Sequence, residues 1–273
     1  MSRYKLVLLV LLLSPVMSSV SMAGPYPPAP GMQGSTAIHM DNPAFIGWAT
    51  ECTAYTPGDE VDSTWQTPEK ALGKATGNSY DVVSLGRGGQ ITLTFSTPIV
   101  DGEGWDFAVF ENSFSDSFLE LAYVEVSSDG MNYLRFDNDS LTANPVGAYG
   151  SIDPTDIEGL AGKYRQGYGT PFDLADLGEK EEVASGMVDL SHITHVRIID
   201  VIGDGTFLYT SGDIIYDPYP TVNSAGFDLD AIGFSNGAAY PEGGYTPPSV
   251  SPHEGEAGFG GEGGCFIIML SNG

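Results

Sequence analysis

Short stretches in which apolar and polar residues alternate are the main pattern along this chain, and they predict β-strands. Residues 90–95 (QITLTF) alternate strictly, which places Ile91, Leu93 and Phe95 on one face of a strand. Apolar residues do not recur at helical spacing over any useful length. Comparable strand-like runs occupy residues 82–85, 106–112, 122–127, 131–136, 194–202 and 226–234.

Turn signals separate these runs, and long irregular segments interrupt them. An Asp-Gly turn predicts that residues 122–127 and 131–136 pair as a hairpin. Residues 137–190 lack a regular pattern, and we expect a long loop with small helices there. About seven short strands with such loops predict an all-β fold, a jelly-roll-like β-sandwich with long decorated loops, over residues 38–237.

The two ends of the chain differ from this body. Arg3 and Lys5 precede an apolar run that ends in small residues, which is typical of a signal peptide over residues 1–23. The run is shorter than a membrane span, so we expect a secreted protein, extracellular or at the cell surface, without a membrane span in its mature chain. Residues 24–37 predict a Pro/Gly linker, and residues 238–273 predict a disordered Gly/Pro-rich tail.

Charge and cysteine content narrow the classes of partner. The chain carries 36 Asp and Glu against 10 Lys and Arg, a net charge of −26. This excess argues against binding to nucleic acid or anionic membranes and favours association with cations. The two cysteines, Cys52 and Cys265, form no zinc-binding motif. An oxidising compartment permits a disulfide between them, although the glycine-rich surroundings of Cys265 argue against one.

Carboxylates occur within two strongly apolar runs, 106–112 (DFAVFEN) and 226–233 (GFDLDAIG). A carboxylate that enters a core needs a cation or a guanidinium to neutralise it. We therefore expect both strands in one sandwich, with acids that help to hold calcium, which prefers six to eight oxygen ligands. In the alternative, these acids cap turns, face water or pair with arginines. The candidate ligands are Asp106, Glu111, Asp200, Asp204, Asp228 and Asp230.

A second candidate site is the segment 163–168 (KYRQGY), which combines two basic residues with two tyrosines in an acidic chain. Tyrosine faces stack on sugar rings and guanidinium groups bind hydroxyls, so this segment is a candidate binding site for a glycan or a surface component. In the alternative, which we favour, the cations neutralise nearby acids and the tyrosines pack a long loop. The residues concerned are Lys163, Tyr164, Arg165 and Tyr168.

The body contains, between roughly residues 40 and 236, the segments SLGRGGQITLTF, GWDFAVFEN, LAYVEVSSDGMNYLRF, AGKYRQGYGTPFDLADL, VRIIDV and GFDLDAIG. Together these segments resemble a group of bacterial secreted cell-surface proteins, many of which carry C-terminal sorting signals. The resemblance implies export and a galactose-binding-like β-sandwich, in which a late-strand aspartate, here Asp230, supplies a ligand to structural calcium. The ending GGCFI resembles the start of a sorting tail, but the membrane helix that follows in that family is absent.

Catalytic motifs do not support an enzyme. The sequence contains no nucleophile elbow, phosphate loop or dinucleotide fingerprint. Asp106 and Glu111 are a poor glycosidase pair, because five residues apart on a strand they face opposite ways. We therefore expect a secreted, non-catalytic, calcium-stabilised β-sandwich that binds a ligand. The alternatives are a structural or adhesive extracellular matrix protein without a small-molecule site, and a glycan-active hydrolase.

Overall fold

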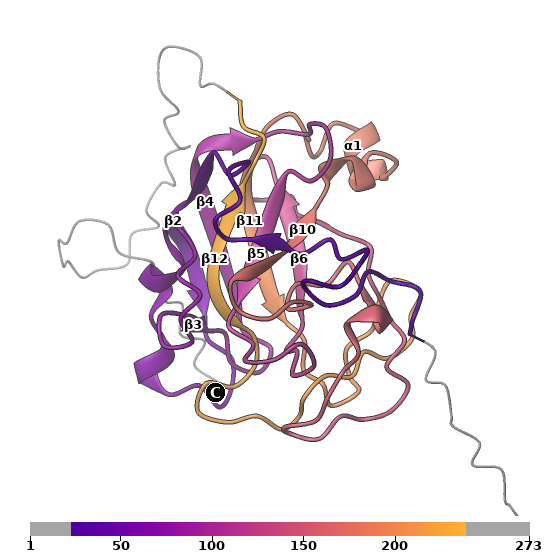
Figure 1. The fold of residues 1–273 in the computed structure, drawn as a ribbon. Helices are drawn as coiled ribbons and strands as arrows, with labels where there is room; N and C mark the ends of the chain where they lie inside the picture. Colours follow the sequence, from indigo (N-terminus) through magenta and orange to yellow (C-terminus); the bar gives the residue numbers. More distant parts are fainter. Residues whose placement is uncertain (1–22, 239–273) are drawn as a thin grey trace, which may run out of the picture.

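The computed structural model describes residues 23–238, which form an all-β, sandwich-like domain and confirm the predicted fold class (Figure 1). No helix within residues 23–238 has the length and apolar character needed to cross a membrane. The helical segments are α1 (Glu181–Ala184) and four 3-10 turns, η1 (Ser63–Trp65), η2 (Pro68–Ala71), η3 (Pro154–Asp156) and η4 (Leu174–Leu177). The strands are β1 (Ile38–His39), β2 (Gly47–Thr56), β3 (Val83–Ser84), β4 (Gln90–Ile99), β5 (Phe107–Glu111), β6 (Ala122–Ser127), β7 (Leu134–Arg135), β8 (Asp139–Ser140), β9 (Ile157–Glu158), β10 (Tyr168–Phe172), β11 (Ile193–Asp200) and β12 (Asp228–Phe234).

Ten of these strands form one antiparallel sheet in the order β1-β10-β5-β12-β2-β4-β11-β6-β7, and β3 pairs with β12. The strands β5 and β12, which contain the two acidic runs, are direct neighbours, since Val109 pairs with Ile232 and Glu111 with Leu229. The long strand β2 pairs with β12 through Trp48 and with β4 further along. It therefore connects the two halves of the sheet.

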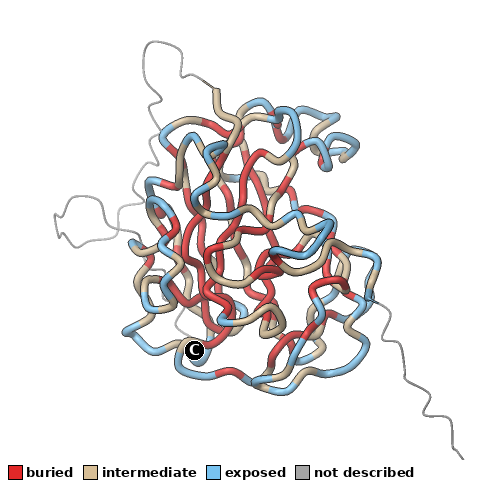
Figure 2. The backbone as a smooth tube through the Cα atoms, viewed as in Figure 1, coloured by how far each residue is buried: buried red, intermediate tan, exposed pale blue. Residues whose placement is uncertain are grey.

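The sheet curls so that its halves face each other across one hydrophobic core. One half contributes Ile91 and Leu93, and the other contributes Val109, Leu229 and Phe234. Figure 2 shows the buried central strands surrounded by loops that are more exposed. Because burial of a Leu or Phe side chain contributes about 1.5–3 kcal/mol, this core is the main source of stability.

The outer face of β5 and β12 is covered as well. Phe110 packs there with Ala231, and Phe45 and Trp105 lie against this cluster. Every residue of β5 and β12 is consequently buried. Carboxylates on these strands are therefore carried into the interior, away from water.

The predicted strands are confirmed at β4, β6, β11 and β12, where alternation or an apolar run was continuous. The prediction of an irregular segment over residues 137–190 is wrong at β10, which pairs with β5 through Thr170 and Phe172. Gly169 and Pro171 interrupt the apolar pattern of this strand. The tertiary pairing therefore outweighs a weak local signal.

The segment predicted as a linker, residues 24–37, is held against the body. The backbone N–H of Gly24 donates to Thr155 Oγ1 at 2.7 Å, and Thr36 Oγ1 lies 2.8 Å from the hydroxyl of Tyr164. These contacts fix both ends of the segment on the domain. The predicted signal peptide and tail fall almost entirely outside the described residues.

Cys52 is buried in β2 and is not a free cysteine. This observation does not support the argument from the sequence against a disulfide. The other cysteine, Cys265, lies outside the described residues.

Candidate metal and ligand sites

Five acidic side chains from distant parts of the chain lie in the interior near one end of β5 and β12. Their residues are 1–5% exposed, far below what is usual for Asp and Glu. We call this group the acid core, and its members are Glu111, Glu120, Asp200, Asp217 and Asp228.

Strand pairing places Glu111 and Asp228 together. Leu229 pairs with Glu111 across β5 and β12, so Asp228 at the start of β12 lies beside the end of β5. The side-chain Nδ2 of Asn112 donates to Asp228 Oδ2 at 3.0 Å. The other oxygen of Asp228 is not held by this contact, which leaves it available to another partner.

Loop contacts bring the remaining members to the same region. The backbone N–H of Phe227 donates to Asp200 Oδ1 at 2.7 Å, which places Asp200 next to Asp228 in the fold. The backbone N–H of Leu121 donates to Asp217 Oδ2 at 3.1 Å, which places Asp217 next to Glu120. The acid core is therefore a feature of the packed fold and not of one motif.

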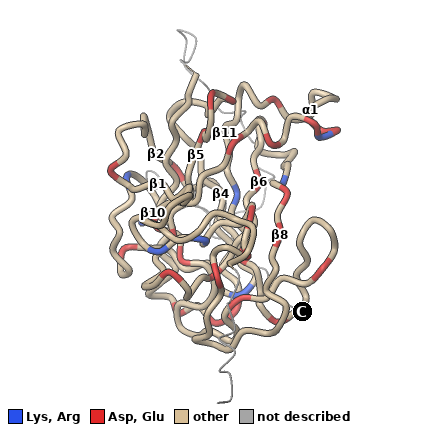
Figure 3. Tube along the Cα trace, turned by 45° about the vertical axis from the view of Figure 1, so that its right-hand side comes forward, with Lys and Arg blue, Asp and Glu red and all other residues tan. Residues whose placement is uncertain are grey.

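Cations do not neutralise the acid core directly. Within residues 23–238, every ion pair of a Lys or Arg within 4.0 Å involves a carboxylate outside this group. Arg87 lies close enough to lower the pKa of Asp200, but its Nη2 donates to the carbonyl of Thr221 at 2.6 Å. Figure 3 shows how sparse the basic residues are among the acidic ones.

Burial changes the proton affinity of all five carboxyl groups. Loss of water raises the pKa of Asp200 and of Asp228 to about 7. Burial, followed by the neighbouring carboxylates, raises the pKa values of Glu111, Glu120 and Asp217 well above their usual range. Holding all five as anions is consequently costly without a cation nearby.

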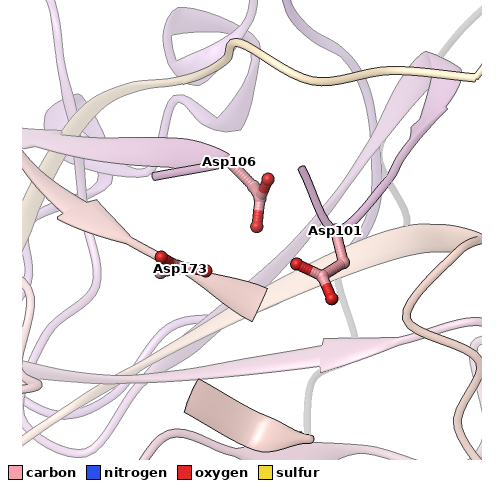
Figure 4. A group of neighbouring side chains, drawn as sticks. All are labelled: Asp101, Asp106 and Asp173. Carbon is pink, nitrogen blue, oxygen red and sulfur yellow. The ribbon is translucent and has the colours of Figure 1, made fainter. Parts of the chain in front are cut away.

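A second group of acids lies at the opposite end of β5. It consists of Asp101, Asp106 and Asp173, whose ligand oxygens all lie within 4.8 Å of one another (Figure 4). Among residues 23–238, no other group of three or more His, Cys, Asp or Glu residues meets this limit. Figure 4 shows their carboxylates around one common space.

Protein groups already bind two of these three carboxylates, those of Asp106 and Asp173. Asp106 accepts from the backbone N–H of Leu174 at 2.7 Å and from Asn236 Nδ2 at 2.8 Å. Asp173 accepts from the backbone N–H of Ala175 at 3.0 Å, as a helix-capping residue does. These contacts join the turn before β5 to η4, which is a structural explanation for the group.

The candidate metal ligands named from the sequence therefore separate into different places. Glu111, Asp200 and Asp228 are in the acid core. Asp230 accepts from the backbone N–H groups of Thr76 and Gly77 at 3.0 and 2.9 Å. The remaining two lie elsewhere, Asp106 in the second group and the exposed Asp204 in a turn.

Two members of the acid core, Glu120 and Asp217, were not identified from the sequence. Glu120 stands alone within the apolar stretch 118–122, and Asp217 directly follows the apolar run 214–216. An acid within or beside an apolar run is the same signal that singled out 106–112. This signal is present at Glu120 and Asp217 too, but it is weaker there because the surrounding segments lack strand alternation.

A cleft of about 660 Å³ opens beside β10, and residues 36 and 38 form part of its wall. Its aromatic residues include Trp105, and four carboxylates lie around it. The lining residues are Thr36, Ile38, Trp105, Phe136, Asp137, Glu158, Gly159, Lys163, Thr170, Pro171, Phe172, Asp173 and Asp176.

The residues of the predicted ligand segment are mostly engaged within the protein. Lys163 is buried, lines the cleft, and places its Nζ 3.0 Å from Glu158. Tyr164 is buried as well. Arg165 forms an ion pair with Asp116 and lies over the ring of Tyr168.

Comparison with models of known protein families, with curated proteins and with solved structures finds no match for this chain.

Proposed function

We propose that this protein is an extracellular, non-catalytic β-sandwich that binds a neutral glycan in the cleft beside β10. The observation that carries the proposal is the combination of Trp105 with four carboxylates around a space of about 660 Å³. An aromatic ring offers an apolar face, and carboxylates accept hydrogen bonds from hydroxyl groups. A space of this size falls within the range of small-molecule sites.

The charge of the cleft selects the kind of glycan. Glu158 and Asp137 are paired with Lys163 and Lys180. Of the other two carboxylates, Asp173 and Asp176, neither forms an ion pair with a Lys or Arg of the described chain. An acidic sugar would meet uncompensated negative charge there, whereas a neutral one supplies only hydrogen-bond donors.

A glycan array that contains neutral and acidic oligosaccharides tests this proposal with the secreted protein. We expect binding to neutral glycans, and Trp105→Ala should reduce it about tenfold or more, since aromatic anchors dominate binding sites. Trp105 also packs against Phe45 at 5.0 Å between ring centroids, so the variant must be checked for folding.

The exposed Asp176 provides a variant that does not disturb the core. Asp176→Lys removes an acceptor at the cleft and should weaken glycan binding. Glu51→Lys makes the same change at an exposed position of β2 and should leave binding intact. A protein that binds no glycan, or that binds equally after Asp176→Lys, would favour a matrix component instead.

One observation favours a glycan hydrolase as a second candidate. Asp173 and Asp176 line the same cleft, and burial, followed by the charge of Asp173, raises the pKa of Asp176. A pair of carboxyl groups beside one binding site is the usual equipment of a glycosidase. Oligosaccharide that is cleaved by the wild type and left intact by Asp176→Asn would replace the binding proposal with this one.

A further inference from the structure

The acid core contains oxygen atoms that the protein leaves without partners. Glu120 Oε1 and Asp228 Oδ1 are buried and make no hydrogen bond. The hydroxyl of Ser84, which is opposite Asp228 in the β3–β12 register, lies near enough to lower the pKa of Asp228 but does not reach hydrogen-bond geometry. An unsatisfied buried polar group costs about 1–3 kcal/mol, and more if it is charged.

These oxygens belong to buried carboxylates whose charges act on one another. After burial itself, the charges that raise the pKa of Glu120 come from Asp228 and then from Glu111. In turn, the charge of Asp228 is the largest neighbouring contribution for Glu111. A Cβ atom at Gly162 would contact both the carbonyl oxygen of Glu120 and the ring of Phe227, the residue before Asp228, so the segment before β6 lies beside the start of β12. Carboxylates from β5, β12 and this segment therefore lie in one buried region.

From this arrangement we propose that Glu111, Glu120 and Asp228 bind one calcium ion inside the acid core. The site is separate from the glycan cleft, and it does not depend on the function proposed for that cleft. It contains two of the ligands expected from the sequence and adds Glu120, which supplies an unpartnered oxygen.

The chemistry of the donors selects calcium among common cations. The acid core offers carboxylate oxygens and no His or Cys, which disfavours zinc. Calcium accepts irregular sets of six to eight oxygens at about 2.4 Å, whereas magnesium requires near-octahedral geometry and keeps several waters. The neighbours Asp200 and Asp217 accept from backbone N–H groups, so the protein already holds these two carboxylates.

Binding requires the three carboxylates to move closer together. The oxygens of the three carboxylates are not all within 4.8 Å of one another, since only the Asp101 group meets that limit in the described chain. Glu111 accepts from the backbone N–H of Ser113 at 2.7 Å through one oxygen. Rotation of the long Glu side chains brings the other oxygens toward a cation and replaces their mutual repulsion with attraction.

Calcium titration of the secreted protein after treatment with a chelator tests this proposal. We expect one high-affinity calcium per chain by calorimetry and a rise in melting temperature on adding calcium. Glu120→Gln and Asp228→Asn should each weaken calcium binding about 100-fold, because they remove charge from the ligand set. Asp101→Asn is the matched control, since it neutralises an acid of the other group, and it should leave the affinity unchanged.

Three results would overturn the proposal. The first is the absence of calcium binding by the wild-type protein, which would mean that protons alone neutralise the acid core. The second is calcium binding that Asp101→Asn abolishes and Glu120→Gln does not. The third is Glu120→Gln with unchanged affinity. Folding is checked in chelator, where Glu120→Gln should melt at or above the wild-type temperature because it removes a repelling carboxyl group.

Discussion

Glu125 shows how this protein satisfies a buried acid when a cation is close. It lies on β6 with 6% exposure, and its two oxygens accept from Arg135 Nε at 2.9 Å and Arg197 Nε at 2.7 Å. The two guanidinium groups also stack over Tyr123 and Tyr133. The members of the acid core have no such partners, although they are buried to a similar degree.

Removal of the Glu125 carboxylate should be strongly destabilising. Glu125→Ala leaves two guanidinium groups facing each other at a partly buried site, so we expect a loss of about 3 kcal/mol in the free energy of unfolding. Urea denaturation measures this loss. The exposed Glu51→Ala, a control on β2, should change stability by less than about 0.5 kcal/mol. Equal effects of the two variants would contradict the expectation.

His195 should make stability depend on pH. Burial lowers the pKa of His195 below its usual 6.5, and the charge of Asp129 only partly offsets this. The folded state therefore favours the neutral imidazole, and its contribution is lost as the pH falls below about 6.5. Between pH 7.5 and pH 5, wild type should lose more stability than His195→Gln in urea denaturation. Parallel pH profiles would show that His195 does not contribute.

At the scale of single elements, β12 depends on an acid as well as on its apolar residues. The register between β12 and β5 shifts between Leu229 and Ala231, and Asp230 lies at this irregularity. Its carboxylate binds the backbone N–H groups of Thr76 and Gly77. One side chain thus attaches the loop before β3 to the central strand.

Asp230→Ala should release this loop. Two backbone N–H groups lose their acceptor, so we expect a loss of about 2 kcal/mol in the free energy of unfolding. Asp230→Asn keeps one acceptor oxygen and should lose less. Urea denaturation compares the variants, and limited proteolysis should find new cleavage near residues 76–79 in the alanine variant only. An alanine variant as resistant as wild type would show that the loop is held by other contacts.

The sequence predicted the elements whose pattern is local. Strict alternation over 90–95 is sufficient to place a half-buried strand, and the structure has β4 there. The strand β10 was missed because its place beside β5 depends on residues more than sixty positions away. For the site, the acids in apolar runs were visible, but their grouping was not, since Glu120 and Asp228 meet only through tertiary packing.

For the whole molecule, a net charge of −26 acts against compact folding. Acidic residues are spread along the whole fold, with few basic residues among them (Figure 3). Like charges separated by several ångströms repel less when salt screens them, and the screening length is about 10 Å at 0.1 M. Repulsion among these charges therefore lowers the stability of the folded state independently of any single bound ion.

Salt should stabilise the protein even when calcium is removed. In the presence of a chelator, raising sodium chloride from about 0.01 to about 0.15 M should raise the melting temperature by about 3 °C, close to 1 kcal/mol for a domain of this size. Differential scanning calorimetry measures the shift. A melting temperature independent of salt would mean that the surface charges are too far apart to matter.

The strand β2 has a consequence for how the molecule opens. Its backbone forms hydrogen bonds with β12 in one half of the sandwich and with β4 in the other. The halves therefore cannot separate while β2 stays paired to both. Its central amide protons should exchange with deuterated solvent only when the entire domain unfolds, with protection equal to the global free energy of unfolding.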